Sequence, residues 1–442
     1  MKTQRIEARI LKGFRDILPA DERIRSQLQN ILQSTFQRCG FVPIDTPALE
    51  YTEILLGKGG GETDKQIYRF NDHGGRDVAL RFDLTVPFAR FMASHSKELQ
   101  LPFKRYHIGK VFRGENTQRG RYREFTQCDF DIVGSDSLSA DFEILQMMAL
   151  SFSELHIPEV QFHISHRGLF NQLLRRLELE EQSAEILRLV DKLRKIGEEK
   201  VREGLEALST STAANDILTF IQAGNSNEET LKTMIRLAGG ESDESRRLRI
   251  VLELASGWDL PAKVHLDPSI TRGLDYYTGI VFETFLLQLP GIGSVCSGGR
   301  YNDLASLYSK EQLPGVGASI GLDRLIAGLT ELDQLPQTGP EAHAIILCLD
   351  EKLLATYHQL ALQLRMEGLR IDVYPEAKKL PKQFSYAEKR GIPFGIIIGE
   401  KEAENRTANL KNLITRHSFD GIALAQLPHL LQEYNQKRRF EI

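Results

Sequence analysis

The sequence predicts an α+β protein with a large domain built on a mainly antiparallel sheet with flanking helices, a helical insertion, and a C-terminal α/β domain. Segments rich in β-branched and aromatic residues, bounded by Gly, Asn or Asp, recur before residue 168 and again after residue 259. Between 169 and 258 aromatic residues become rare and apolar residues return at helical spacing. Beyond 342 strand patterns alternate with helical ones, which is typical of an α/β domain.

The same changes of pattern predict the domain boundaries. The large domain would occupy residues 1–168 and 259–333, the helical insertion 169–258, a Pro/Gly/Gln-rich linker 334–341, and the C-terminal domain 342–442. At roughly 100–200 residues per domain, a chain of 442 residues is long enough for this organisation.

An amphipathic helix opens the large domain. Apolar residues recur at helical spacing after Pro19 and an acidic first turn, so we expect a helix that ends near Arg38 and is stopped by Gly40. The next segment, FVPIDTPALE, reads as extended. Because Pro43 and Pro47 cannot donate ladder hydrogen bonds, this segment belongs at a sheet edge or an interface, which makes it a candidate dimer contact.

Four further segments predict strands of the sheet: DVALRFDL, RYHIGKVFR, REFTQCDFDIVG and YTGIVFETFLLQL. Helices at 141–155 and 321–332 would cover them, the second after a glycine-rich stretch, GVGASIG, that suits a buried strand. In the C-terminal domain we expect strands in AHAIILCLD, LRIDVYP and FGIIIGE and a helix at 352–367. These elements predict a largely parallel core for that domain.

The composition, 41% hydrophobic and 26% charged, is that of a globular protein, and no apolar run approaches the ~20 residues of a membrane span. The N-terminus lacks the apolar core of a secretory signal, so we expect a cytoplasmic protein with no membrane partner. Four scattered cysteines without a CxxC pair and eleven histidines without HExxH spacing predict no disulfide framework and no protein-ligated transition metal. Because the net charge is -4, a nucleic-acid partner would have to be held by local basic patches.

Residues 105–131, RYHIGKVFRGENTQRGRYREFTQCDFD, join two strand patterns through a basic loop. Arg113 and Glu115 are two residues apart on an extended segment, so their side chains point the same way. With Phe125 the hairpin combines a cation for phosphate, an acceptor for adenine and a ring for stacking. This combination predicts an ATP site, and an ordinary hairpin with surface charges is the alternative reading of this stretch alone.

Two glycine-rich stretches have different interpretations. LGKGGGETDK at 56–65 does not fit the phosphate-loop pattern GxxxxGK[ST], so a mobile lid is the better interpretation. CSGGRYNDL at 296–304 places two glycines in a strand-like context, where a ligand can approach the backbone, and a simple turn is the equal alternative. Arg272 could neutralise charge on a reacting phosphate, and Arg324, in an apolar context, requires an anionic or aromatic partner.

Taken together, these stretches resemble the histidyl-tRNA synthetases, a family of class II aminoacyl-tRNA synthetases. CGFVPIDTPALE resembles the class II dimer motif, VFRGENTQRGRYREF the second class motif and GVGASIGLDRL the third. RGLDYYT at 272–278 and SGGRYNDL at 297–304 resemble the two histidine-specific signatures. KKLPKQFSYAEKRGIPFGIIIGE resembles the family's anticodon-binding domain, so the resemblance covers nearly the whole chain and implies a class II synthetase-like fold.

The resemblance implies roles for individual residues. For ATP, Arg113 would hold the α-phosphate, Glu115 the adenine edge, Phe125 and Arg324 the two ring faces, and Arg121 the far phosphates. For histidine, Asp83, Thr85 and Gln127 would receive the α-ammonium, and Asp131, Tyr276 and Tyr277 the imidazole. Arg272 would lie near the α-phosphate and the histidine carboxylate, so the catalytic residues would be Arg113, Arg272 and Gln127. Planar cations suit phosphate and adenine, and carboxylates suit an ammonium group or a ring N–H.

The resemblance also implies the reaction and the partners. Histidine would attack the α-phosphate of ATP, which arrives with Mg²⁺, and the histidyl group would then pass to the 3′ end of histidine tRNA, in a homodimer. Gln118, Arg119 and Arg123 would meet the acceptor end. Contact of the helical insertion with the acceptor arm is a separate hypothesis, which the resemblance does not supply. Lys378 and Lys382 would belong to a basic face for the anticodon, for which a solvated helix face is the alternative reading.

Two departures from the commonest bacterial pattern keep the acidic chemistry: RFDLT stands where RPEGT is frequent, and Asp131 where Glu is frequent. The main alternative function is a synthetase-like regulatory subunit of a phosphoribosyltransferase of histidine biosynthesis. Such subunits usually lack the C-terminal domain and the signature arginines, both of which are present here. A synthetase for another amino acid would share the class motifs but not RGLDYYT and SGGRYNDL.

Overall fold

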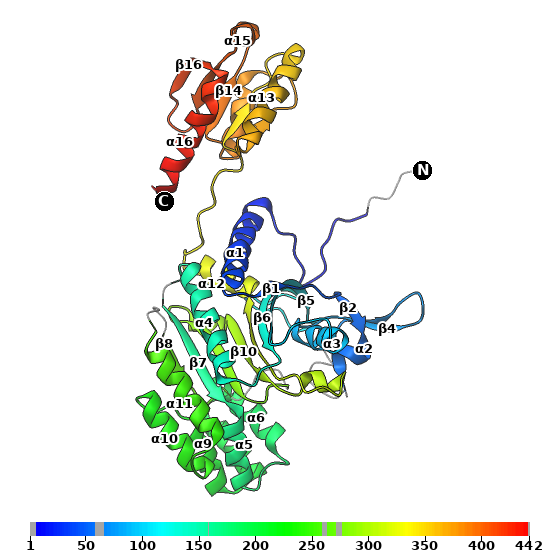
Figure 1. Cartoon of the computed structure of the whole chain (residues 1–442), viewed down its shortest axis with the longest axis vertical. Helices are drawn as coiled ribbons and strands as arrows, with labels where there is room; N and C mark the ends of the chain where they lie inside the picture. The colour runs from blue at the N-terminus through cyan, green and yellow to red at the C-terminus, as the bar shows by residue number, and fades with distance from the viewer. Residues whose placement is uncertain (1–5, 58–65, 158, 259–262, 271–275, 441–442) are drawn as a thin grey trace. The chain divides into compact units, whose positions relative to one another are not determined.

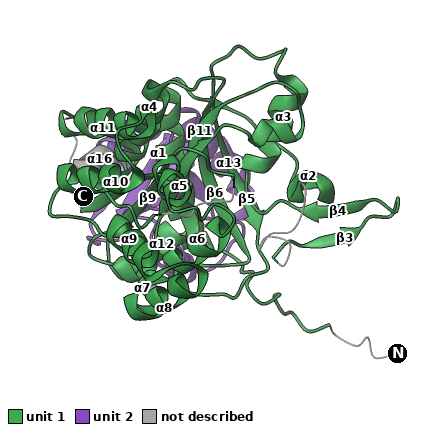
Figure 2. Ribbon diagram, turned by 90° about the horizontal axis from the view of Figure 1, so that it is seen from below, with its two compact units in different colours: residues 1–335 green, residues 336–442 purple. Residues whose placement is uncertain are grey.

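The computed structural model describes residues 6–57, 66–157, 159–258, 263–270 and 276–440. It divides into two compact units, residues 1–335 and 336–442 (Figure 2). The boundary falls within the segment predicted as a linker, and the finer division of the first unit stays a prediction. Arg272 and most of the predicted glycine-rich lid, residues 58–65, lie outside the described residues.

Unit 1 is built on an eight-stranded sheet in the order β1-β5-β6-β11-β10-β9-β7-β8. The strands are β1 (Val42–Pro43), β5 (Phe103–Phe112), β6 (Glu124–Val133), β7 (Val160–His166), β8 (Lys263–Leu266), β9 (Ile280–Leu286), β10 (Cys296–Tyr301) and β11 (Gly315–Gly321). Neighbours are antiparallel except for the two edge pairs, β1–β5 and β7–β8. The predicted mainly antiparallel sheet is therefore confirmed, and the proline-containing segment forms an edge strand as expected.

The two faces of this sheet differ in chemistry because successive side chains of a strand point to opposite sides. Cys128, Phe130 and Ile132 of β6 belong to the apolar core, together with side chains of α1 (Pro19–Arg38) and α4 (Leu138–Glu154), which pack on each other and on the central strands (Figure 1). The alternate β6 residues, Gln127 and Asp131, therefore point to the opposite face. This polar face positions the candidate site.

A second, three-stranded antiparallel sheet precedes β5, in the order β2-β4-β3. Its strands are β2 (Leu49–Tyr51), β3 (Arg69–Asn71) and β4 (Asp77–Leu80), and α2 (Thr52–Leu56) and α3 (Thr85–His95) accompany it. The DVALRFDL segment was expected in the main sheet, and that expectation is wrong. Its first half forms β4, and its second half, residues 81–84, leads to the start of α3 at Thr85.

The segment from 167 to 256 is helical, as predicted, and its helices gather beside β7 and β8 (Figure 1). They are α5 (Arg167–Arg176), α6 (Ser183–Asp191), α7 (Leu193–Ile196), α8 (Glu198–Leu208), α9 (Ser211–Ile221), α10 (Asn227–Ala238) and α11 (Asp243–Ser256). Hydroxyl side chains cap three of them, since Thr210, Ser226 and Ser242 accept hydrogen bonds from the backbone N–H groups of the first turn. No helix in the described part of the chain is long and apolar enough to cross a membrane.

Unit 2 carries a five-stranded sheet in the order β13-β12-β14-β15-β16. Its strands are β12 (Ala344–Ile346), β13 (Ile371–Val373), β14 (Phe394–Ile397), β15 (Thr407–Asn412) and β16 (Ser418–Ala423), and its helices are α13 (Leu354–Met366), α14 (Leu380–Lys389), α15 (Glu400–Asn405) and α16 (Leu427–Phe440). The first three strands are parallel, as predicted, whereas β15 and β16 add an antiparallel extension that was not predicted.

A buried carboxylate joins three elements of unit 1. Asp323, at the start of α12 (Leu322–Glu331), is 3% exposed. Its oxygens accept hydrogen bonds from Arg25 of α1 (2.8 Å), from the backbone N–H of Thr126 on β6 (2.6 Å) and from Arg15. This network fixes the start of α12, and therefore the backbone of Arg324, against the sheet.

We predict that Asp323→Asn destabilises unit 1 by about 3 kcal/mol, because it leaves the buried Arg25 guanidinium without its counter-charge. The chain's single tryptophan, Trp258, stacks on Phe142 of α4 with ring centroids 6.0 Å apart, so its fluorescence during urea unfolding reports on unit 1. Glu206→Gln, at an exposed position of α8 in unit 1, is the matched control and should change the stability by less than about 0.5 kcal/mol. Equal midpoints for the two variants would contradict the structural role of Asp323.

Candidate active site

A cavity of about 560 Å³ lies over β6, β10 and β11. Residues that the sequence predicted as functional come from distant parts of the chain to line it: Thr85, Arg113, Glu115, Arg121, Phe125, Gln127, Asp131, Tyr276, Tyr277 and Arg324. Because β6 contributes alternate residues from Phe125 to Asp131, one strand runs along the floor from one end of the cavity to the other. The two ends have different chemistry.

One end is cationic. The guanidinium of Arg113 lies 5.1 Å from the centre of the Phe125 ring, and its Nε donates to the carbonyl oxygen of Phe82 (2.9 Å). The Arg121 guanidinium lies 3.4 Å from a carboxylate oxygen of Glu115. A flat cation, an aromatic face and a carboxylate acceptor are therefore presented together, which suits a purine carrying phosphates.

Arg324 completes this end from α12. Its Nη1 donates to the carbonyl oxygen of Ser294 (2.6 Å). Burial, together with the charges of Arg121 and Arg113, lowers the pKa of Arg324 to about 10. Three guanidinium groups that repel one another in a partly buried site favour the binding of a polyanion.

The other end is built around the buried carboxylate of Asp131, which is 2% exposed. One of its oxygens lies 2.7 Å from the Arg105 guanidinium in an ion pair, and the other accepts a hydrogen bond from the Tyr301 hydroxyl. Burial raises the pKa of Asp131, and Arg105 and the hydrogen bond from Tyr301 oppose that rise. Arg105, completely buried, lies over the ring of Phe88 at 4.1 Å. Arg105 and Tyr301 were not predicted as site residues, although Tyr301 lies within the SGGRYNDL signature.

Glycines of β10 and β11 make room for these side chains. A Cβ atom at Gly317 would lie 2.0 Å from a carboxylate oxygen of Asp131, and one at Gly299 would lie 2.8 Å from the Tyr277 ring. Such distances are shorter than any van der Waals contact, so any side chain at these positions would displace the Asp131 carboxylate or the Tyr277 ring. In the second glycine-rich stretch, residues 296–301 form strand β10, so the alternative of a simple turn is wrong for them. Gly298 lines the cavity, and approach of a ligand to its backbone stays a prediction.

Asp83 lies behind Tyr276. It is completely buried and is not among the described residues that line the cavity, whereas its neighbour Thr85 is. Its carboxylate accepts hydrogen bonds from the Tyr276 hydroxyl (3.0 Å) and from the backbone N–H of Val86 (3.1 Å). Burial raises the pKa of Asp83 to about 6. Contact of Asp83 with an ammonium group stays a prediction.

The residues predicted to meet tRNA lie outside this cavity. Gln118 and Arg119 are exposed in the β5–β6 loop, where Arg119 forms an ion pair with Glu331 of α12. The Arg123 guanidinium is held by backbone carbonyl oxygens, including that of Glu115 (3.2 Å). Lys378 and Lys382 are exposed near the start of α14, and Lys378 pairs with Glu376. Their contacts with tRNA stay predictions.

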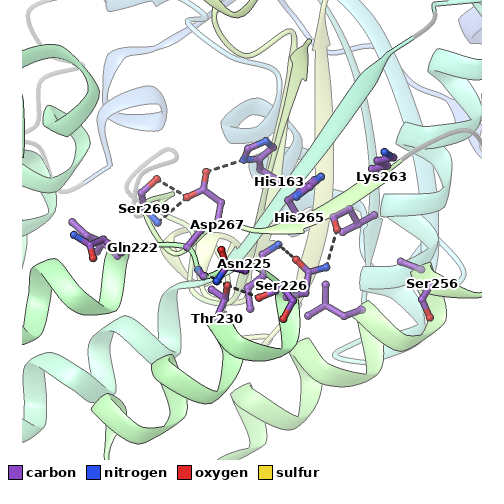
Figure 3. Close-up of a pocket in the computed structure, with 18 of the residues that line it drawn as sticks. His163, Gln222, Asn225, Ser226, Thr230, Ser256, Lys263, His265, Asp267 and Ser269 are labelled. Carbon is purple, nitrogen blue, oxygen red and sulfur yellow. Dashed lines mark hydrogen bonds and ion pairs between the residues drawn. The ribbon is translucent and has the colours of Figure 1, made fainter.

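A second cavity, of about 840 Å³, lies between β7–β8 and helices α9 to α11 (Figure 3). Its polar wall includes His163, whose Nδ1 lies 2.8 Å from a carboxylate oxygen of Asp267. None of the predicted site residues is among its described lining. Within the described ranges no group of three or more His, Cys, Asp or Glu side chains is arranged to hold a metal ion.

Comparison with known proteins identifies the family. The family model described as histidyl-tRNA synthetase matches residues 13–325, and the model described as anticodon binding domain matches residues 343–434. The histidine–tRNA ligase of Treponema denticola is 51% identical over 399 residues, which is 89% of each chain. That of Helicobacter hepaticus is 44% identical over 440 residues, covering 97% of this chain and 99% of the relative.

Solved structures show the same relationship. The histidyl-tRNA synthetase of Nostoc is 32% identical, covers 97% of this chain and 100% of its own, and superposes with a TM-score of 0.84. A Bacillus halodurans protein described as an ATP phosphoribosyltransferase regulatory subunit/histidyl-tRNA synthetase is 22% identical with a TM-score of 0.74 and shows the fold alone. On these matches, which span nearly its whole length, the chain belongs to the histidyl-tRNA synthetase family.

Proposed function

We propose that this chain joins L-histidine to histidine tRNA, and that the cavity of about 560 Å³ activates the histidine with ATP. One observation carries the proposal: a single cavity has a cluster of three guanidinium groups at one end and a buried carboxylate flanked by tyrosines at the other. The first suits a triphosphate and the second an imidazole. Family membership supports the same reaction.

ATP would bind at the cationic end. Adenine would lie between Phe125 and Arg324, with Glu115 accepting from its amino edge, while Arg113 holds the α-phosphate and Arg121 the far phosphates. The 5.1 Å spacing of Arg113 and the Phe125 ring supports this assignment, because it keeps the cation beside the aromatic face. Mg²⁺ enters with ATP as part of the substrate.

Histidine would bind at the carboxylate end. Asp131 would accept from an imidazole N–H, with Tyr276 and Tyr277 closing the pocket, while Thr85 and Gln127 receive the α-ammonium. An analogue without the ring N–H would leave the buried Asp131 carboxylate with one partner fewer, which costs more than a lost surface contact. This difference provides the discrimination between histidine and other amino acids.

The activation step needs positioning and charge neutralisation and does not require a protein nucleophile. The histidine carboxylate oxygen attacks the α-phosphorus, the new O–P bond gives histidyl-adenylate, and pyrophosphate leaves. Arg113 and Arg272 would stabilise the charge that develops on the α-phosphate, and Gln127 would hold the amino acid in line. In the second step the 3′-terminal ribose hydroxyl of the tRNA takes the histidyl group and AMP leaves.

Transfer RNA would contact both units. Gln118, Arg119 and Arg123 would meet the acceptor end, and their position in the β5–β6 loop beside the cavity supports this. Lys378 and Lys382 would contact the anticodon region. Because the net charge of the chain is -4, such local basic patches carry the phosphate contacts. We assign the reaction to the cytoplasm, where protein synthesis uses charged tRNA.

The enzyme would act as a homodimer. Exposed apolar side chains gather on the edge strand and the small sheet: Val42 (46%), Leu49 (40%), Tyr51 (48%) and Phe70 (47%). Tyr51 and Phe70 flank Val78 in register, so they form one row across the β2-β4-β3 sheet. A second copy of the chain would cover this row.

We predict that ATP–pyrophosphate exchange by the purified protein depends on histidine and on no other amino acid. Arg113→Ala should lower the exchange rate at least about 100-fold, because it removes a cation from the charge that develops in the transition state. Arg188→Ala, an exposed arginine of α6, is the matched control and should retain full exchange. A folded protein that exchanges with another amino acid, or with none, would refute the proposed function.

We predict sedimentation as a dimer at micromolar concentration. Tyr51→Asp should shift the protein toward the monomer, because a buried unpaired carboxylate opposes association. Met366→Asp, at an exposed apolar position of α13, should leave the dimer intact. A monomeric wild type would remove the dimer from the proposal without affecting the activation step.

A further inference from the structure

A third carboxylate of the polar face is not explained by the proposed roles. Asp129 lies between Gln127 and Asp131 on the same face of β6, where alternate side chains point the same way. It is 1% exposed and is not among the described residues that line the cavity. A side-chain hydrogen bond with Ser319 acts to lower the pKa of Asp129, and Oδ1 of Asp129 is buried with no partner among the described residues.

Ser319 connects this carboxylate to the cavity. Ser319 of β11 is the cross-strand neighbour of Asp129 in the sheet register, and it lines the cavity. Its Oγ accepts a hydrogen bond from Nε2 of Gln127 (2.8 Å). A chain of hydrogen bonds therefore runs from Gln127 through Ser319 to Asp129.

The polarity of this chain follows from the chemistry of its last member. An ionised carboxylate only accepts hydrogen bonds, so the Ser319 hydroxyl must donate its single proton to Asp129. The Ser319 oxygen is then left to accept, and Gln127 can meet it only with its NH₂ group. The carbonyl oxygen of Gln127 is thereby turned away from Ser319 and is available as an acceptor for an ammonium group.

We propose that Asp129 and Ser319 are positioning residues that fix the Gln127 amide with its carbonyl oxygen toward the α-ammonium of histidine. The inference rests on the proposed function, because it assumes that histidine binds beside Gln127. It identifies two residues that act on the substrate through Gln127. It also predicts that the orientation depends on the charge of Asp129.

A protonated Asp129 no longer fixes the direction of these hydrogen bonds. Its hydroxyl can donate to Ser319, which can then donate to the carbonyl oxygen of Gln127. In that arrangement the amide turns its NH₂ group toward the ammonium, where it cannot accept. Burial raises the pKa of Asp129 to about 7, with Asp131 and Asp83 adding to the rise and Arg105 opposing it. Because the ionised form of Asp129 fixes the amide, the affinity for histidine should increase as the pH rises through about 7.

The other titratable and charged groups near Asp129 do not mimic this change. Its cross-strand neighbour on β5, His107, has a pKa lowered to about 3 by burial and by Arg105 and Arg81, so it stays neutral. Tyr276, Tyr277 and Cys296 have pKa values raised by burial, so they stay protonated. Asp131, whose pKa burial also raises, and Asp83, with a pKa of about 6, would act on histidine directly in wild type and variants, so the ratio of the two KM values and not the wild-type pH profile reports on Asp129.

The test measures histidine-dependent ATP–pyrophosphate exchange by full-length wild type and Asp129→Asn between about pH 6 and pH 8. At the upper pH the variant should show a KM for histidine raised about tenfold, the effect of one hydrogen bond to a charged group. Its kcat and its KM for ATP should stay within about twofold of wild type, which also reports a folded site. The ratio of the two KM values should fall toward one at the lower pH, because protonation gives the wild type the same defect.

Ser319→Ala separates the hydrogen-bond chain from the charge alone, since it keeps the Asp129 carboxylate. It should raise the KM for histidine as much as Asp129→Asn does, and the double variant should be no worse than either. Three results would overturn the proposal. They are a normal KM for histidine in Ser319→Ala, additive increases of this KM in the double variant, and a ratio of Asp129→Asn to wild-type KM that does not change with pH. If the wild type exchanges normally and the variants have the same KM for histidine, only this inference is refuted. If the wild type shows no histidine-dependent exchange, the proposed function is refuted.

Discussion

The buried ion pair between Asp131 and Arg105 is the interaction on which the rest of the site depends. Arg105 and Asp131 are cross-strand partners on β5 and β6, so the register of the central hairpin sets their contact. Taking both charges out of water is costly, and the Tyr301 hydroxyl and the Phe88 ring offset part of that cost. A one-residue slip of the hairpin would turn every β6 side chain to the opposite face and would remove both ends of the cavity.

Strand β6 is central to the site, because its alternate side chains face the apolar core on one side and the polar face of the sheet on the other. Cys128, Phe130 and Ile132 of β6 fill the apolar core with α1 and α4. On the opposite face, the odd-numbered residues present in order the ring of Phe125, the amide of Gln127 and the carboxylates of Asp129 and Asp131. Asp323 ties the same strand to α12, which supplies Arg324. Strand β6 therefore contributes both to the apolar core of unit 1 and to the lining of the cavity.

Much of this arrangement could be predicted from the sequence. The helical spacing of α1, the aromatic and β-branched hairpin β5–β6 and the glycine-rich strand before α12 each carry a strong local signal. The sequence motifs also identified ten of the 25 described residues that line the cavity. Arg105 could not be found in this way, because its role comes from cross-strand register and not from spacing along the chain. Ser319 and Asp129 were missed for the same reason.

The elements that were wrong or missing share a physical cause. DVALRFDL has a strand composition, but composition does not say which sheet a strand joins, so β4 was assigned to the wrong one. Strand β7 (VQFHISH) and strands β15 and β16 mix polar residues with apolar ones and are completed by their neighbours in the sheet. Arg272, which the sequence motifs single out as catalytic, lies outside the described residues, so its role rests on the family resemblance.

In the proposed function, Gly317 of β11 leaves the space in which the Asp131 carboxylate would meet the imidazole. Titration calorimetry of histidine binding to Gly317→Ala tests it most directly, because the added Cβ would lie 2.0 Å from the Asp131 carboxylate. Gly291→Ala is the matched control, since a Cβ at that position meets nothing within 4 Å. Gly317→Ala should weaken histidine binding at least about tenfold, whereas ATP binding and the Gly291→Ala control should be unchanged. Histidine affinity equal to that of wild type in a folded Gly317→Ala protein would contradict it.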